Sequence, residues 1–215
     1  MRIAIIGAGN IGTALTKRFT AVGHEVFVAN SRGPETLAEL VSTTGATALS
    51  VAEVAKGADV AVVTIPVYRV PDLPAGLLDG AAPDLVVIDT GNYYPQRDGR
   101  IAAIENGTTE SRWVSQQIGR PVIKAFNTIQ AQHLLELGQP AGTPGRIALP
   151  VAGDDEHAKA VVMRLVDEIG FDPVDSGGLD DSWRQQPGSP VYAKDYDAEK
   201  TRLALAQAEP RRNEG

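Results

Sequence analysis

The chain has 215 residues, a hydrophobic fraction of 43% and a formal net charge of −7 at pH 7, so its length allows one large α/β domain or one domain with a small appendage. The absence of cysteine excludes disulfides, thiolate nucleophiles and cysteine-ligated metals, and the three histidines lack metal-ligand spacing. The excess of acidic over basic residues, 27 to 20, argues against a nucleic-acid partner.

The first twelve residues predict a strand, a glycine-rich turn and the start of a helix. Residues 3–6 are a continuous apolar run, typical of a strand buried on both faces of a parallel sheet. Gly7, Gly9 and Gly12 then form G-x-G-x-x-G, which allows a tight turn, a close approach to a pyrophosphate and close helix packing. Apolar residues continue at helical spacing, at Ile11, Leu15, Phe19 and Val22. We therefore expect a dinucleotide at the N-terminus of this helix.

The tip of the second predicted strand, residues 25–29, indicates which dinucleotide binds. NAD-binding folds place a carboxylate at this tip to hold the ribose, whereas here Asn30, Ser31 and Arg32 follow the strand. Ser31 can donate a hydroxyl hydrogen bond, and Arg32 offers a charged planar fork to a 2′-phosphate. The tip therefore predicts NADP(H), the alternative being a solvated turn arginine.

Three further buried strands are predicted over residues 59–65, 85–88 and 121–126. The carboxyl ends of parallel strands border the ligand crevice of a doubly wound sheet, so the loops after these strands are expected to converge there. The residues expected to bind the cofactor are Gly7, Gly9, Asn10, Ile11, Gly12, Asn30, Ser31, Arg32, Thr64, Ile65 and Pro66. The residues expected to line the substrate crevice are Tyr68, Asn92, Tyr93, Lys124, Phe126, Asn127, Thr128 and His133.

The remaining pattern predicts smaller elements and a carboxyl-terminal lobe. A helix is expected from Pro34, with Leu37, Leu40 and Val41 facing inward, and an edge strand over residues 146–151, interrupted by Pro150. A second helix is capped by residues 153–156 and continues to Ile169, and a strand follows over 171–174. The chain then continues as a loop over 176–192, a helix over 197–208 and a frayed tail over 209–215. We divide the chain into an NADP-binding domain, residues 1–178, and a terminal segment, residues 179–215.

Several of these pieces resemble the coenzyme F-420-dependent NADP oxidoreductase family, whose domain also occurs in the six-transmembrane ferric reductases. The matching pieces are residues 6–12, 23–26, 30–32, 64–66, 124–129 and 151–155. The resemblance implies a Rossmann-type, doubly wound, mostly parallel α/β sheet with a small C-terminal lobe. It also implies NADP along the glycine-rich turn, hydride exchange with a flavin-like ring, and a homodimer. The chain departs from the family pattern in residues 89–100 and 182–188, where the second substrate should lie.

Three functions are compatible with the sequence. The leading one is hydride transfer between NADP(H) and a deazaflavin or flavin, with no essential side-chain acid. The second is NADPH-dependent reduction of a small carbonyl, imine or enone, which needs a proton donor beside the acceptor. The available donors are Lys124, Tyr93, Tyr94 and His133. For each of them a structural role at the crevice edge is favoured over catalysis, so the catalytic residues stay unassigned. The third is a non-catalytic NADP(H) sensor.

We expect a cytoplasmic protein with a small-molecule partner and with no metal, nucleic-acid or membrane partner. No apolar run approaches the roughly 18 residues that a bilayer span requires. A secretory leader is not expected, because the first strand is predicted to begin at residue 2.

Overall fold

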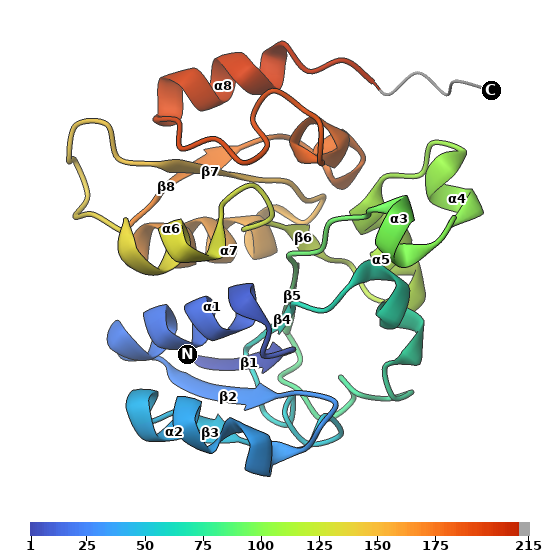
Figure 1. Cartoon of the computed structure of the whole chain (residues 1–215), viewed down its shortest axis with the longest axis vertical. Helices are drawn as coiled ribbons and strands as arrows, with labels where there is room; N and C mark the ends of the chain where they lie inside the picture. The colour runs from blue at the N-terminus through green and yellow to red at the C-terminus, as the bar shows by residue number, and fades with distance from the viewer. Residues whose placement is uncertain (211–215) are drawn as a thin grey trace.

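Six parallel strands form the central sheet of the computed structural model, which describes residues 1–210 (Figure 1). The strands are β1 (Arg2–Ile6), β2 (Glu25–Ala29), β3 (Thr47–Ala48), β4 (Val60–Val63), β5 (Val86–Asp89) and β6 (Ile123–Lys124). Their order across the sheet is β3-β2-β1-β4-β5-β6, and every pairing is parallel. This order confirms the predicted Rossmann-type doubly wound fold.

Helices and 3-10 turns alternate with these strands. The α-helices are α1 (Asn10–Ala21), α2 (Ala38–Thr44), α3 (Pro95–Asp98), α4 (Ala102–Glu105), α5 (Glu110–Ile118), α6 (Ala131–Glu136), α7 (Glu156–Glu168) and α8 (Ala198–Ala206). The 3-10 segments are η1 (Pro34–Leu37), η2 (Val67–Asp72) and η3 (Leu179–Gln185). None of the helices within residues 1–210 combines the length and the hydrophobicity that a membrane span needs.

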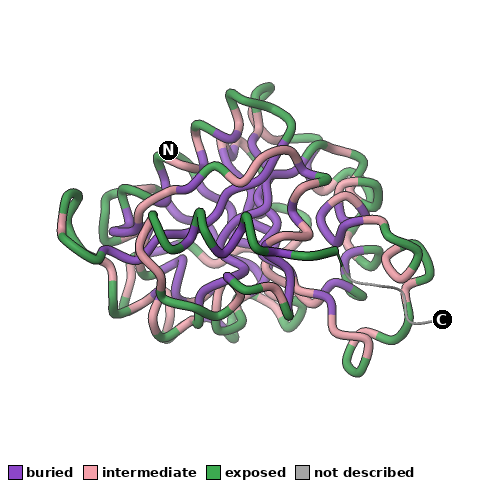
Figure 2. The backbone as a smooth tube through the Cα atoms, turned by 90° about the horizontal axis from the view of Figure 1, so that it is seen from above, coloured by how far each residue is buried: buried purple, intermediate pink, exposed green. Residues whose placement is uncertain are grey.

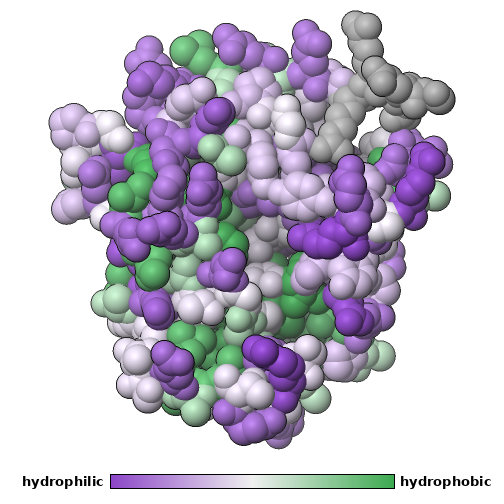
Figure 3. All heavy atoms as spheres, viewed as in Figure 1, coloured by the Kyte–Doolittle hydropathy of each residue, from purple (hydrophilic) through white to green (hydrophobic). Residues whose placement is uncertain are grey.

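Two hydrophobic cores lie on the two faces of the sheet. Ile3 and Ile5 of β1 enter one core, together with side chains of α1, α6 and α7. Ala4 and Ile6 enter the other core, beside η2 and α5. This alternation follows from the period of two in a strand and explains why β1 is apolar throughout. Figure 2 shows the buried backbone in the centre, and Figure 3 shows polar side chains over much of the visible face, with apolar patches between them.

The strand predicted at the edge of the main sheet lies in a second sheet. Strand β7 (Ala148–Val151) pairs in parallel with β8 (Asp172–Asp175). The two sheets are connected by the backbones of Lys124 and Ala152, which exchange hydrogen bonds of 2.8 and 3.0 Å. Pro150 is tolerated because a strand in a two-stranded sheet has one unpaired edge. The strand therefore has the edge character that was predicted, but it belongs to a separate sheet.

The carboxyl-terminal segment packs on this second sheet. Ala148 and Val174 of the sheet share a small core with Val191 and with Ala204 and Leu205 of α8. The segment expected to be a loop, residues 176–192, includes the 3-10 helix η3.

Other boundaries also differ from the sequence expectations. Val22, expected on the buried face of α1, is 42% exposed just beyond the end of that helix. Strand β6 is shorter than predicted because Phe126 takes a left-handed backbone conformation, with φ of +62°. Helix α5 was not predicted, although its cap is local: Thr109 Oγ1 accepts a hydrogen bond from the Arg112 amide, and Gly119 ends the helix at φ of +72°. The predicted cap of α7 is confirmed, because Asp155 accepts from the Ala158 amide at 3.0 Å.

Candidate functional site

The three glycines between β1 and α1 lie in two different surroundings. Gly7 has a φ of +112°, and an added Cβ would lie 2.5 Å from the carbonyl oxygen of Thr64. A Cβ on Gly12 would lie 1.9 Å from the carbonyl oxygen of Gly7. A Cβ on Gly9 would meet no atom within 4 Å, although this residue forms the N-cap of α1. Backbone atoms of the protein therefore leave no room for a side chain at Gly7 and Gly12, whereas Gly9 borders open space where a ligand can approach.

The ends of four neighbouring strands are connected beside this turn. The Gly7 amide donates to Ala29 O at 2.9 Å, which connects the ends of β1 and β2. The Thr64 amide donates to Ile6 O at 2.9 Å, and the Thr90 amide donates to Val63 O at 3.1 Å. The structure thus brings the glycine turn, Thr64 and the loop after β5 to one edge of the sheet. Ile65 packs against Gly7 from the same side.

Other residues expected at the cofactor lie around this edge. Asn10 and Ile11 begin α1, with Asn10 exposed and Ile11 partly buried. Pro66 is half-buried and directly precedes η2. Tyr68, on η2, is 41% exposed at the surface.

The tip of β2 presents two free side chains on a turn that Asn30 shapes. Asn30 Oδ1 accepts from the Arg32 amide at 2.9 Å, and Asn30 Nδ2 donates to Thr36 Oγ1 at 2.9 Å. Ser31 and Arg32 are exposed, and within residues 1–210 their side chains form no hydrogen bond or ion pair. The Asn30 side chain therefore stabilises the turn at the tip, while the side chains of Ser31 and Arg32 remain available to a ligand.

A carboxylate that the sequence reasoning missed also lies at this tip. Glu35 is in the first turn of η1, and its Oε1 lies 2.4 Å from the position that a Cβ on Gly33 would take. The side chain therefore folds back over the turn that carries Arg32. The spacing of the two residues could have indicated this placement, because a 3-10 turn brings a residue back beside the residue three positions before it, here Arg32. A negative charge here opposes binding of a phosphate beside Arg32.

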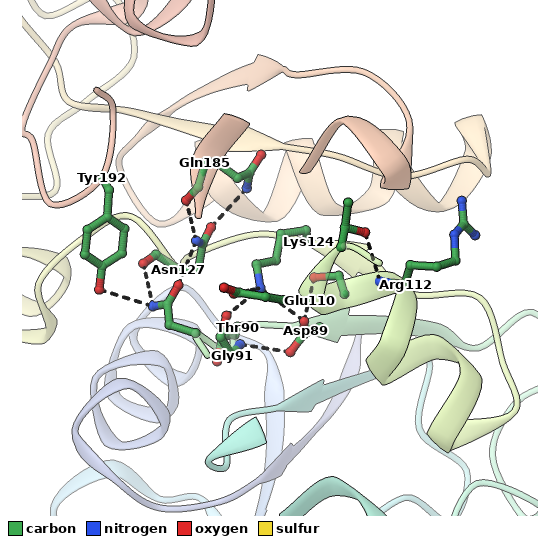
Figure 4. Close-up of polar contacts among 12 residues, drawn as sticks. Asp89, Thr90, Gly91, Glu110, Arg112, Lys124, Asn127, Gln185 and Tyr192 are labelled. Atoms are coloured by element: carbon green, nitrogen blue, oxygen red, sulfur yellow. Dashed lines mark hydrogen bonds and ion pairs between the residues drawn. The ribbon is translucent and has the colours of Figure 1, made fainter. Parts of the chain in front are cut away.

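Amide side chains connect the loops after β5 and β6 with the carboxyl-terminal segment (Figure 4). Asn92 Nδ2 donates to Asn127 O at 3.0 Å, and Asn127 Nδ2 donates to Asn92 Oδ1 at 3.0 Å. Asn127 Nδ2 also donates to Gln185 O at 2.7 Å, and Gln185 Nε2 donates to Asn127 Oδ1 at 3.0 Å. Two residues predicted at the crevice are thus brought together, and they are joined by Gln185, which lies within residues 182–188 but was not among the predicted site residues.

A pair of tyrosines lies beside these amides. The hydroxyl groups of Tyr94 and Tyr192 are hydrogen-bonded to each other, and Asn92 Nδ2 donates to the Tyr192 hydroxyl at 3.4 Å. Burial, together with the hydrogen bond to Tyr94, raises the pKa of the Tyr192 phenol well above its ordinary value. Tyr192 ends the segment 176–192, which was predicted as a loop and which includes the residues 182–188 where the chain departs from the family pattern.

Lys124 was expected at the crevice, but its side chain is fully buried. Its Nζ lies 3.2 Å from Asp89 Oδ2 and 3.8 Å from Glu110 Oε2, and it donates a hydrogen bond to Gly91 O. Asp89 also accepts from the Ser111 hydroxyl at 2.6 Å. Lys124 therefore neutralises buried carboxylates and fixes the loop after β5, which corrects its placement at the crevice surface.

Tyr93 and Phe126 are also buried rather than placed on a crevice surface. The Tyr93 hydroxyl lies 2.7 Å from Glu105 Oε1 and accepts from the Ile101 amide at 3.0 Å. Burial of this phenol raises its pKa. The ring of Phe126 is fully buried and meets Phe19 edge-on at 6.3 Å between ring centroids. Both expectations are corrected, because aromatic side chains in these positions complete the cores.

The last two crevice candidates lie in different settings. Thr128 is 3% exposed, and its carbonyl oxygen accepts from the Ala193 amide at 2.9 Å. His133, on α6, lies with its Nδ1 2.7 Å from Asp195 Oδ2. These contacts hold the carboxyl-terminal segment against α6 and the end of β6. Among the described residues, no group of three or more His, Asp or Glu side chains has a geometry suited to a metal ion.

The chain is similar to NADP-dependent oxidoreductases. Residues 2–93 match the family model described as NADP oxidoreductase, coenzyme F420-dependent. The solved structure of a hypothetical protein from Sinorhizobium meliloti is 32% identical, with a TM-score of 0.76, and the match covers 90% of this chain and 94% of that one. A structure from Arthrobacter, named for a proposed F420-dependent NADP-reductase activity, is 24% identical over 83% of this chain and 85% of that one, with a TM-score of 0.64.

A further similarity is confined to part of the chain. Over 59 residues the chain is 52% identical to the protein YjhV of Escherichia coli, a match that covers 27% of this chain and 43% of that protein. The chain therefore spans less than half the length of this curated relative.

Proposed function

We propose that the chain, which is similar to the coenzyme F420-dependent NADP oxidoreductase family over residues 2–93, transfers a hydride between NADP(H) and a flavin-like or deazaflavin ring. One observation carries the proposal. Gly9 opens onto free space at the N-terminus of α1, at the edge where the ends of β1, β2, β4 and β5 meet. Ligands of doubly wound sheets bind at such an edge.

The residues around this edge fit a dinucleotide with a 2′-phosphate. The first amides of α1, after Gly9, have no partner within the helix and suit a pyrophosphate. Ser31 and Arg32 are exposed and offer a hydroxyl and a guanidinium to the 2′-phosphate. Thr64, Ile65 and Pro66 would border the remainder of the cofactor. When bound, NADPH supplies the hydride, and the protein supplies binding and orientation.

The surroundings of the crevice support a planar hydride acceptor. Ring-to-ring transfer needs stacking and alignment, and the hydrogen bonds among Asn92, Asn127 and Tyr192 fix the loops beside which a ring would be aligned. A small carbonyl or imine would instead need a proton donor at the reacting atom. Lys124 and Tyr93, two of the four donors considered, are buried and engaged with protein carboxylates. A carbonyl or imine reduction would therefore have to use one of the two remaining candidate donors, Tyr94 or His133.

A panel of acceptors tests the proposal. NADPH oxidation would be followed by its absorbance with riboflavin, FMN, 5-deazariboflavin, a quinone, a small ketone and a cyclic imine. We expect turnover with the ring acceptors, and with NADPH in preference to NADH. Turnover confined to the ketone or the imine would replace the proposal with the reductase alternative. NADPH binding without turnover of any acceptor would favour the sensor.

A further inference from the structure

Two phenol groups from distant parts of the chain meet beside the amide side chains that connect the loops after β5 and β6. Tyr94 follows the loop after β5, and Tyr192 comes from the carboxyl-terminal segment; both side chains are partly exposed. Their hydroxyls are hydrogen-bonded to each other, and Asn92 Nδ2 donates to the Tyr192 oxygen at 3.4 Å. Figure 4 shows Tyr192 beside the amides at the end of β6.

The number of protons in this pair leaves one of them without an acceptor. Two hydroxyl groups carry two protons, and the bond between the hydroxyls uses one of them. The third group, Asn92 Nδ2, is itself a donor and adds no acceptor. Within residues 1–210 neither hydroxyl has a further hydrogen-bonding partner. Whichever tyrosine donates within the pair, the other retains an O–H that can donate to a ligand.

The pair is held in place from both sides. Arg97 lies over the Tyr94 ring, 5.0 Å from its centroid, and donates to Asn92 O at 2.6 Å. On the other side, the Ala193 amide donates to Thr128 O at 2.9 Å, and Ala193 has a φ of +55° that non-glycine residues rarely adopt. This backbone conformation turns the chain directly after Tyr192. A donor that is fixed before a ligand arrives loses little conformational entropy on binding.

We propose that the Tyr94–Tyr192 pair donates a hydrogen bond to an oxygen or nitrogen at the edge of the planar hydride acceptor. The inference rests on the proposed function and adds to it a class of second substrate: planar rings that carry a carbonyl oxygen or a ring nitrogen able to accept a hydrogen bond. Both tyrosines are positioning residues in this account. Because Tyr192 belongs to the terminal segment, that segment takes part in selecting the acceptor.

Three variants and one control test the pair. The variants are Tyr94→Phe, Tyr192→Phe and the double variant, and the control is Tyr196→Phe, whose ring packs against the small carboxyl-terminal core. Each would be examined for KM and kcat with NADPH and 5-deazariboflavin. Equilibrium binding of 5-deazariboflavin in the presence of NADP⁺ gives a readout independent of turnover. NADP⁺ affinity and far-UV circular dichroism would report the cofactor site and the fold.

The proton count predicts a non-additive result. Each single variant leaves one hydroxyl whose proton is no longer shared, so KM and the dissociation constant of 5-deazariboflavin should rise less than about threefold. The double variant removes the last donor, and both constants should rise about tenfold, the effect of one neutral hydrogen bond. The kcat and the NADP⁺ affinity should change less than about threefold. Tyr196→Phe should match the wild type.

The possible failures differ from one another. If the wild type turns over 5-deazariboflavin and the double variant has the KM of Tyr196→Phe, the inference is wrong and the proposed function stands. A fall in kcat of about a thousandfold in the double variant would show an acid catalyst instead of a positioning pair. If the wild type neither binds nor reduces any ring acceptor, the proposed function is wrong, and so is the inference that rests on it.

Discussion

Asn92 and Asn127 exchange hydrogen bonds across the ends of β5 and β6: Asn92 Nδ2 donates to Asn127 O, and Asn127 Nδ2 donates to Asn92 Oδ1, both at 3.0 Å. Asn127 also binds Gln185, so one amide connects the sheet edge with the carboxyl-terminal segment. The side chains that would face a second substrate are therefore fixed relative to the strand ends that would hold the cofactor. Such preorganisation suits a reaction that depends on alignment.

Gly9→Val should abolish binding of both NADP(H) and NAD(H) and leave the protein folded. The new side chain has room in the protein itself, since an added Cβ meets no atom within 4 Å, but it would fill the space expected for the pyrophosphate. Titration of both cofactors, with circular dichroism beside it, measures this. Gly12→Ala is the matched control: its Cβ would lie 1.9 Å from Gly7 O, so loss of stability is expected there. A Gly9→Val protein that binds NADPH normally would place the cofactor elsewhere.

Arg32→Ala should weaken NADP⁺ binding by roughly tenfold to a hundredfold and leave NAD⁺ nearly unchanged, since it removes a charged hydrogen bond to the 2′-phosphate alone. Glu35→Gln should act in the opposite direction. Removing a carboxylate that folds back over Gly33 should strengthen NADP⁺ binding by about twofold to fivefold. Calorimetric titration of both dinucleotides measures these effects. Equal losses of NADP⁺ and NAD⁺ affinity in Arg32→Ala would mean that Arg32 is structural.

Lys124→Met should reduce the free energy of unfolding by about 3–5 kcal/mol, because it leaves Asp89 and Glu110 buried without their cation. Denaturant unfolding measures the loss. The exposed Lys17→Met is a suitable control, with an expected change below about 0.5 kcal/mol. A Lys124→Met protein of wild-type stability and sharply reduced kcat would instead indicate a catalytic lysine.

The Asp154 carboxylate should stabilise the fold at neutral pH and lose this effect in acid. It accepts a hydrogen bond from the Leu179 amide and lies 2.8 Å from Arg112 Nη2, and these contacts lower its pKa from 3.8. A lowered pKa in the folded state means that stability is fully present above 3.8 and is lost as the pH falls through the folded value. Wild type should therefore exceed Asp154→Asn in denaturant midpoint at about pH 7, and the gap should close towards about pH 2. A gap that is independent of pH would contradict this.

The sequence predicted the parts of the fold that local patterns determine. The run before Gly7 and the three glycine positions specify a buried strand, a turn and a helix over a few consecutive residues, and the strand order followed from repetition of that unit. The cap at Asp155 was equally local. Helix α5 was missed because its residues are largely polar, although Thr109 and Gly119 mark its ends.

The candidate site was harder to predict because side-chain direction depends on tertiary contacts. Lys124 lies next to residues expected at the crevice, yet it points into the protein because Asp89 and Glu110, distant in sequence, pair with it. Tyr192 and Gln185 could not be anticipated, since their partners Asn92 and Asn127 lie about 60 to 100 positions earlier in the chain. The separation of β7 from the main sheet likewise depends on its pairing with β8.

Transfer of deuterium from NADPH labelled at the reactive C4 position to 5-deazariboflavin tests the central claim most directly. The carbon that accepts the hydride in a deazaflavin does not exchange with water, so mass spectrometry of the reduced product follows the transferred nucleus. Direct transfer predicts one deuterium per reduced molecule, formation of NADP⁺ and a slower reaction with the labelled cofactor. A reduced product without deuterium, or no oxidation of NADPH by this acceptor or by any flavin, would contradict the account.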